Sequence, residues 1–204
     1  MQPRFSTLIG LTFLCSALLF PFAISALYLP ELRNQAFDFH ELIRGDLYKQ
    51  ITGYIALVLV LGEMILTLRK RGRQFWIKIT MPGSIKFWRR LHIFVGVALL
   101  AIVLIHTAGL TGHNFNASFL WIFFGVTLSA LVGVVAETGV LESAQQRFYL
   151  MPHHAKFFGK NWEGISKGAL IRTLREIWIS LHILLVSVFF LFLGIHIYLA
   201  YHFQ

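Results

Sequence analysis

The chain has 204 residues, of which 57% are hydrophobic and 13% are charged, and its mean hydropathy is +0.69. This composition excludes an ordinary soluble domain and indicates a polytopic membrane protein, with residues 1–204 forming one domain. The formal net charge is +9, but the basic residues are distributed as in membrane proteins, so no nucleic-acid partner is expected. The single cysteine, Cys15, excludes an internal disulfide.

The first apolar run long enough to cross a bilayer covers residues 8–29, and Pro21 is expected to kink it. Its sequence also fits a cleavable signal peptide, but we expect a retained, peripheral helix.

Residues 30–49 carry four acids against three bases and are expected to form an external loop with a short amphipathic turn. His40 in this loop is expected to be solvated, and a surface metal or ligand contact is the alternative.

The second predicted span covers residues 50–68. Gly53 and Gly62 in this span permit the close approach of a neighbouring helix or a flat ligand. Glu63 lies inside the span, and we expect its carboxylate to pair with the basic residues at 69–71. A role for Glu63 as a proton acceptor near a ligand site is the alternative.

Three further spans are predicted at residues 91–110, 119–140 and 177–201. The short connection at 111–118 makes the third and fourth spans adjacent and antiparallel. Residues 164–178 space their apolar side chains along one face and predict an amphipathic helix lying on the membrane surface. The fold class is therefore all-α, a polytopic membrane bundle with five transmembrane helices.

Lysine and arginine gather on one side of the predicted membrane. Residues 69–90 contain eight of them and residues 141–176 contain six, so that with Arg4 this side holds 15 of 18. By the positive-inside rule this side is the cytoplasm. We therefore expect a cytoplasmic N-terminus, an external C-terminus and a location in the bacterial inner membrane.

Two spans carry histidines at the same spacing, in stretches offset by 90 residues. His92 and His106 lie in the third span and His182 and His196 in the fifth, 14 residues apart in each case. Fourteen helical residues rise ~21 Å and return to nearly the same face, so each helix presents two imidazoles near opposite ends of a ~30 Å hydrocarbon layer. A role as hydrogen-bonded core residues is the alternative, but intramembrane polar rings are costly and usually functional.

The third and fifth spans are separated by one span, so they run parallel and keep equivalent residues at equal depth. His92 is therefore expected to pair with His182, and His106 with His196. Each pair can supply both axial ligands of one b-type haem, held without covalent attachment because the chain has no CxxCH motif. Such six-coordinate iron has no open position, which predicts an electron carrier and no catalytic residue.

Residues beside the histidines are expected to accommodate the two haems. Arg89 and Arg90 precede His92, where haem propionates need cations. Four glycines leave room for a macrocycle or a neighbouring helix: Gly96, Gly125, Gly133 and Gly194. The other histidines are expected to be dispensable for haem: His40, His113, His153, His154 and His202.

At the four spaced histidines the chain resembles the cytochrome b of quinol–cytochrome c reductases and the transmembrane domain of ferric reductases and NADPH oxidases. The resemblance covers residues 50–201 and implies a haem-binding core from the second to the fifth helix. The first family implies a quinone as a further ligand. No quinol-oxidising loop, sixth span or GxGxxG motif is evident, so a separate redox subunit or carrier protein is expected as partner.

Three functions remain open from the sequence. The first is transmembrane electron transfer as the cytochrome b subunit of a quinone-linked membrane oxidoreductase. The second is a ferric-reductase-like protein that receives electrons from a separate flavoprotein. The third is a haem-free membrane protein whose histidines bind a metal or relay protons.

Overall fold

The computed structural model describes residues 4–71, 82–108, 114–149 and 164–202, with the backbone of 156–157 and 160–161; the side chains of 66–71 lie outside this description. The helices of these parts are, in chain order, α1 (Phe5–Ala23), α2 (Ser25–Gln35), α3 (Phe37–Arg44), α4 (Asp46–Arg71), α5 (Ile85–His106), α6 (Phe115–Glu142) and α7 (Lys167–His202). Two short antiparallel pairs join β1 (Arg147–Phe148) to β4 (Ile165–Ser166) and β2 (Lys156–Phe157) to β3 (Lys160–Asn161).

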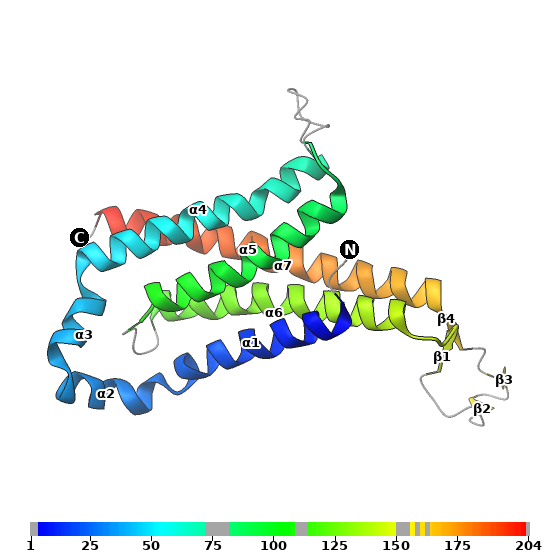
Figure 1. Cartoon of the computed structure of the whole chain (residues 1–204), viewed down its shortest axis with the longest axis horizontal. Coiled ribbons are helices and arrows are strands. Elements are labelled where there is room, and N and C mark those ends of the chain that lie inside the picture. Colours follow the sequence, from blue (N-terminus) through cyan, green and yellow to red (C-terminus); the bar gives the residue numbers. More distant parts are fainter. Residues whose placement is uncertain are drawn as a thin grey trace.

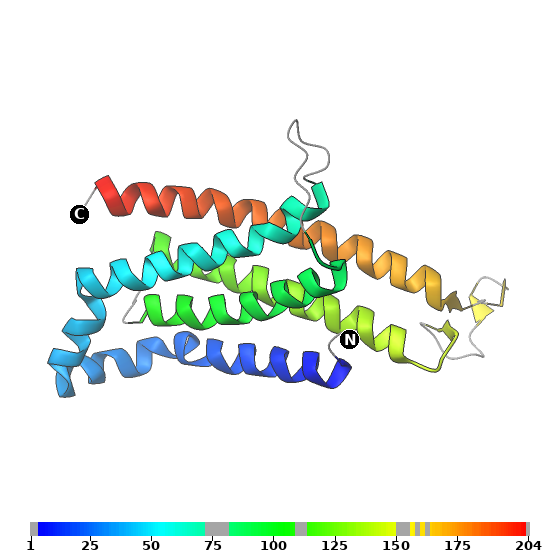
Figure 2. The ribbon, with the colours of Figure 1, turned by 45° about the horizontal axis from the view of Figure 1, so that its top comes forward.

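The predicted all-α class is confirmed. Five of the described helices, α1, α4, α5, α6 and α7, are long and apolar enough to cross a membrane, as expected of a multi-pass membrane protein. They lie side by side along the long axis of the molecule, while α2 and α3 cross one end and connect α1 to α4 (Figures 1 and 2). The C-terminus lies at this crossing end, and the N-terminus lies toward the opposite end (Figure 1).

The region after the first span differs from the expected loop. The first span ends at Ala23, and after Ile24 the chain continues as α2 and then α3. His40 lies in α3 and is buried, with 7% of its surface exposed, so the prediction of a solvated loop residue was wrong. The reason is helical phase, because His40 and Ile43 are three residues apart and therefore share the inward face of α3.

The last helix also differs from the prediction. Residues 164–178 do not form a separate surface helix, because α7 runs without interruption from Lys167 to His202. Neither glycine nor proline occurs between Gly168 and Gly194, so no residue in this stretch breaks the helix. Its 36 residues correspond to ~54 Å, which exceeds the hydrocarbon layer. With α6, it projects beyond the other helices at the end that carries the strands (Figure 2).

Helix starts and packing fix the register of the bundle. Ser84 caps α5 by accepting a hydrogen bond from the Phe87 amide at 3.2 Å, and Asn114 caps α6 through the Ala117 amide at 2.9 Å. In chain order, α4 and α5 form one antiparallel hairpin and α6 and α7 form another (Figure 1). One apolar cluster joins the five long helices, and its buried residues are Cys15, Val60, Leu99, Leu100, Leu120, Phe123, Phe124, Leu131 and Phe189.

Candidate functional site

Each spaced histidine of α5 has one spaced histidine of α7 as its neighbour. The rings of His106 and His196 have centroids 6.1 Å apart and planes at 89°. His182 lies close enough to His92 for the two rings to interact electrostatically. These are the partners expected from parallel helices. The sequence therefore predicted the juxtaposition of the histidines correctly.

The two helices that carry the histidines stand apart. In the described residues, no Cα atom of α5 lies within 8 Å of a Cα atom of α7. The space between their backbones is therefore bridged by side chains alone, including both histidine pairs. Helix pairs in direct contact have axes 8–10 Å apart, so α5 and α7 are separated more widely than packed neighbours.

A threonine of α4 orients His106. Thr52 Oγ1 lies 3.0 Å from His106 Nδ1 and donates its own hydrogen to the Tyr48 carbonyl at 2.7 Å. Because the hydroxyl hydrogen is used in that bond, Oγ1 accepts from the Nδ1–H of His106. The neutral ring then carries its lone pair on Nε2, the atom that a metal requires.

Two residues of α6 orient the histidines of α7 in the same way. Ser129 Oγ lies 3.1 Å from His182 Nδ1 and donates to the Val126 carbonyl at 2.8 Å. Asn116 Oδ1 lies 3.0 Å from His196 Nδ1 and, as a carbonyl oxygen, accepts the ring hydrogen. Both rings therefore keep the Nε2 lone pair free.

Glu63 contacts the fourth histidine. Its Oε2 touches His92 Nδ1, although the approach lies outside hydrogen-bonding geometry, and its Oε1 finds no hydrogen-bond partner among the described residues. The side chains of 69–71, which were expected to pair with Glu63, lie outside the described residues. Each histidine thus has a side-chain oxygen from the preceding helix at its Nδ1. In α4 these oxygens belong to Thr52 and Glu63.

The N-terminal part of α4 also clamps the end of α5. Lys49 Nζ donates to the carbonyls of His106 at 2.5 Å and Ala108 at 2.8 Å, and the Tyr48 hydroxyl donates to the Ile105 carbonyl at 2.8 Å. The last carbonyls of a helix have no intrahelical partner and carry partial negative charge. An ammonium group at this place therefore fixes the position of His106 and adds positive charge beside it.

Apolar side chains occupy the level between the two histidine pairs. Leu99 and Phe189 each lie seven residues from both histidines of their helix, and both belong to the buried apolar cluster. Phe119 of α6 connects this layer to the second pair, with ring centroids 5.3 Å from Phe189 and 5.4 Å from His196. The described side chains that connect the two levels are therefore apolar or aromatic.

The four glycines have different surroundings. A Cβ atom on Gly133 would lie 2.5 Å from the Trp178 ring, and one on Gly125 would make ordinary contact with Leu185 at 3.8 Å, so both positions pack α6 against α7. Gly96 leaves space beside the Glu63 carboxylate, and Gly194 has open space within 4 Å of such an atom among the described residues. A Cβ atom on Gly53 would lie 3.2 Å from the His106 ring, so this glycine allows the imidazole to approach α4 closely.

Trp178 and an ion pair flank His182. The indole and imidazole centroids are 6.3 Å apart, and the buried Trp178 Nε1 finds no hydrogen-bond acceptor among the described residues. Glu137 of α6, a buried acid that the sequence reading did not single out, binds Arg175 of α7 one turn before Trp178.

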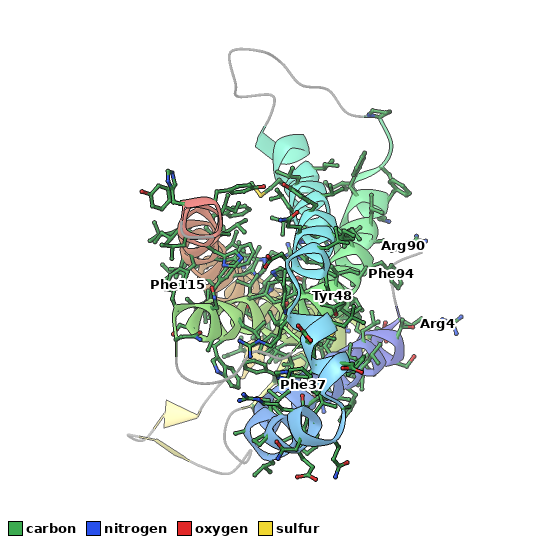
Figure 3. The ribbon with its side chains drawn as sticks, turned by 90° about the vertical axis from the view of Figure 1, so that its left-hand side faces the viewer. Arg4, Phe37, Tyr48, Arg90, Phe94 and Phe115 are labelled. Atoms are coloured by element: carbon green, nitrogen blue, oxygen red, sulfur yellow. The ribbon has the colours of Figure 1, made fainter. Side chains whose placement is uncertain are left out.

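The remaining predicted residues lie outside this centre. Arg89 and Arg90 are exposed, and Arg90 points outward from α5 (Figure 3). His202 is exposed and packs on Tyr198, with ring centroids 4.3 Å apart. The other three histidines fall outside the described residues: His113, His153 and His154.

The candidate metal ligands of this site come as two pairs of histidines. Within the described parts of the chain, no three His, Cys, Asp or Glu side chains converge in an arrangement that could hold a metal ion. Two imidazoles match the protein contribution to a metal whose other four ligands come from a macrocycle. Comparison of the chain with protein-family models, curated proteins and solved structures gave no match.

Proposed function

We propose that this protein is a dihaem membrane cytochrome b that carries electrons across the membrane. His92 and His182 would hold one haem b, and His106 and His196 the other. The observation that carries the proposal is the common environment of the histidines. The Nδ1 atoms of His106, His182 and His196 each lie at hydrogen-bonding distance from a side-chain oxygen, which leaves the Nε2 lone pair of each ring available, and His92 Nδ1 contacts the Glu63 carboxylate.

The spacing of the second pair supports this assignment. With a metal–nitrogen bond of about 2 Å, two imidazoles on opposite sides of one metal ion have ring centroids roughly 6 Å apart. His106 and His196 have centroids 6.1 Å apart. The wide separation of α5 from α7 fits a bulky planar ligand. The unpaired indole donor of Trp178 fits an acceptor such as a propionate near His182.

Haem supplies one-electron oxidation and reduction of iron, which the amino acids of the chain lack. With both axial positions taken by histidine, the protein orients the ligands and excludes substrates from the metal. Thr52, Ser129, Asn116 and Glu63 fix the imidazoles. The apolar layer around Leu99 and Phe189 blocks ions, so charge crosses the membrane as electrons.

The partners follow from the need for a donor and an acceptor. By the positive-inside rule, the proposed orientation has the basic connections in the cytoplasm and the His106 and His196 pair toward the outside, and the proposed location is a bacterial inner membrane. A separate redox subunit, carrier protein or flavoprotein exchanges electrons with the chain, and a quinone is a further candidate. Rates of haem reduction by a quinol analogue and by a reduced flavoprotein would distinguish the quinone-linked from the ferric-reductase-like function.

Haem content tests the proposal directly. The full chain is expressed with sufficient haem supply, purified, and analysed by pyridine haemochrome and by reduced-minus-oxidised spectra. We expect two haems b per chain and low-spin spectra. Folded protein with fewer than two haems contradicts the proposal. Metal analysis of such a haem-free preparation would then test the remaining function, in which the histidines bind a metal ion or relay protons.

A further inference from the structure

Resting on the proposed haem ligation, we propose that the haem of the second pair, His106 and His196, enters from the lipid bilayer between α4 and α7. Tyr54 and Tyr201 close this entrance. The seam is the boundary between α4 and α7, which lies on the side of the bundle away from α1 (Figures 2 and 3). The ligand that such an entrance takes is a planar, lipid-soluble tetrapyrrole.

The α4–α7 seam differs from the other three sides of the four helices that surround the histidines. Within the described residues, no Cα atom of α4 lies within 8 Å of a Cα atom of α7, whereas α4 with α5, α5 with α6, and α6 with α7 all approach this closely. Helix axes in direct contact are 8–10 Å apart. Backbone packing therefore closes three sides of the four helices and leaves the fourth to side chains.

Side chains also close those three sides near the second pair. Lys49 ties α4 to the end of α5, and Phe115 of α6 stacks on Phe192 of α7 with ring centroids 5.1 Å apart. The side formed by α5 and α6 is covered by α1, which contacts both helices and places Phe22 against Phe124 of α6, at 5.5 Å between centroids. A rigid macrocycle cannot pass these contacts without unpacking the bundle.

A hydrogen bond between two tyrosines closes the seam itself. The hydroxyl groups of Tyr54 in α4 and Tyr201 in α7 bond to each other, and no other hydrogen bond joins these two helices in the described residues. Tyr54 follows Gly53, the glycine beside the His106 ring, and Tyr201 lies five residues after His196. The two tyrosines therefore span the seam beside the second pair, and we call them the tyrosine strap.

The strap is weak. Its two members lie on the surface, with exposed fractions of 54% for Tyr54 and 67% for Tyr201, so each hydroxyl can exchange its partner for water or a lipid headgroup. A hydrogen bond with such alternatives favours the closed seam over the open one by about 2- to 10-fold. Tyrosine suits this place, because its ring and its hydroxyl prefer the boundary between the apolar and polar layers of a membrane.

A gate on the entry path changes rates and leaves affinity unchanged. The strap closes the same seam with and without haem, so breaking it should speed haem uptake and haem loss by the same factor. A residue that only stabilises the fold or the bound haem behaves differently, since its removal speeds dissociation and weakens binding. The two rates measured together therefore identify the role of the strap.

Haem exchange of the full chain in lipid nanodiscs tests the proposal. Loss is followed as transfer of haem to excess apomyoglobin, and uptake by adding haem b to the haem-depleted chain. Tyr54→Phe and Tyr201→Phe each keep the ring and remove one hydroxyl. Each should speed both processes about 2- to 10-fold for one haem, the haem that His106→Ala perturbs. The double variant should be no faster than either single variant, because a single bond is lost in all three.

The matched control is Tyr198→Phe. Tyr198 is an exposed tyrosine of the same helix that packs on His202, and its hydroxyl makes no hydrogen bond among the described residues. Both haems should exchange at wild-type rates in this variant.

A cross-link over the seam tests the entry path from the opposite side. Tyr54→Cys/Tyr201→Cys, in a Cys15→Ala chain, is joined by a bismethanethiosulfonate reagent, whose linkages a reductant cleaves. Joining the haem-depleted chain should prevent haem uptake at the second pair, and reduction should restore it. The single variant Tyr54→Cys, treated in the same way, cannot be bridged and should take up haem normally.

The outcomes separate this proposal from the proposed function. Fewer than two haems in the folded wild-type chain overturns both. Two haems with unchanged exchange in the Tyr→Phe variants, or uptake at the second pair that continues in the cross-linked chain, overturns the entry path alone. Faster loss without faster uptake also overturns it, because the tyrosines then hold the haem or the fold and not the entrance.

Discussion

His106 of α5 and His196 of α7 lie with their ring centroids 6.1 Å apart, although no described Cα atoms of these helices approach within 8 Å. The rings thus reach across a space that the helix backbones leave open. Nearer the other end, His92 and His182 lie close enough to interact electrostatically.

The pairing predicts which mutations affect the same haem. On the proposed haem ligation, His92→Ala and His182→Ala should perturb one haem, and His106→Ala and His196→Ala the other, because each variant would remove one axial ligand and open the metal to carbon monoxide. Carbon monoxide difference spectra with redox titrations measure this. The double variant His92→Ala/His182→Ala should keep one intact low-spin haem. Perturbation of both haems in that variant would indicate crossed pairing.

The hydrogen bond from His106 to Thr52 predicts weaker haem binding when it is removed. Thr52→Ala should lower haem affinity about 10- to 100-fold at this pair, the usual cost of losing an outer partner of a metal ligand. Thr52→Ser keeps the hydroxyl and should restore affinity. Thr127→Ala is a suitable control, since the Thr127 hydroxyl donates to the Phe123 carbonyl of its own helix at 3.1 Å. Equal haem retention in Thr52→Ala and Thr127→Ala would contradict the assigned role.

Much of the fold could be predicted from sequence because apolar length and helical period are local properties. The five spans follow from runs of apolar residues, and the two histidine pairs follow from a 14-residue spacing on parallel helices. The continuous α7 and the helices α2 and α3 could not be read in this way. Whether a helix bends onto the membrane surface or continues depends on tertiary packing, and the phase that buries His40 depends on where α3 begins.

The partners of the histidines were missed although a signal existed. Thr52 and Glu63 are polar residues 11 apart in one apolar span, and Asn116, at the start of α6, and Ser129, near its middle, are 13 apart. Both intervals are close to the histidine spacing, and antiparallel hairpins bring such residues to matching depths. Glu63 was instead assigned to the nearby basic residues, since sequence proximity is a poor guide to contacts between helices.

Close packing of Trp178 on α6 predicts a strong effect at Gly133. Gly133→Ala should destabilise the folded protein by about 1–3 kcal/mol, because the new methyl group would overlap the indole and force it to shift. Gly10→Ala in α1 is the control, since no described atom lies within 4 Å of its added Cβ. Thermal unfolding in mild detergent measures both. A Gly133→Ala protein as stable as Gly10→Ala would show that the indole relaxes at no cost.

The distribution of basic residues predicts sidedness. Ser84 precedes α5 and Ser118 lies in the first turns of α6, and both side chains are exposed. In intact cells, a membrane-impermeant thiol reagent should label Ser118→Cys and not Ser84→Cys, after replacement of Cys15 by Ala. Permeabilised cells should show both labels. The reverse pattern in intact cells would invert the proposed orientation.

The ion pair between α6 and α7 predicts unequal costs for its two members. The Glu137 side chain is 9% exposed and the Arg175 side chain 45% exposed. Arg175→Met leaves a buried carboxylate without its partner, which should cost about 1–3 kcal/mol. Glu137→Gln leaves a guanidinium that water can solvate, so its cost should be smaller.

A double-mutant cycle in mild detergent, followed by thermal unfolding, separates the interaction from other effects of each substitution. The double variant Glu137→Gln/Arg175→Met has no charge to strand, so it should be more stable than Arg175→Met alone. The two haems should remain, because neither residue contacts a histidine ring in the described structure. If the two single variants lose equal stability and their effects add, the buried carboxylate does not depend on Arg175, and water or another group must solvate it.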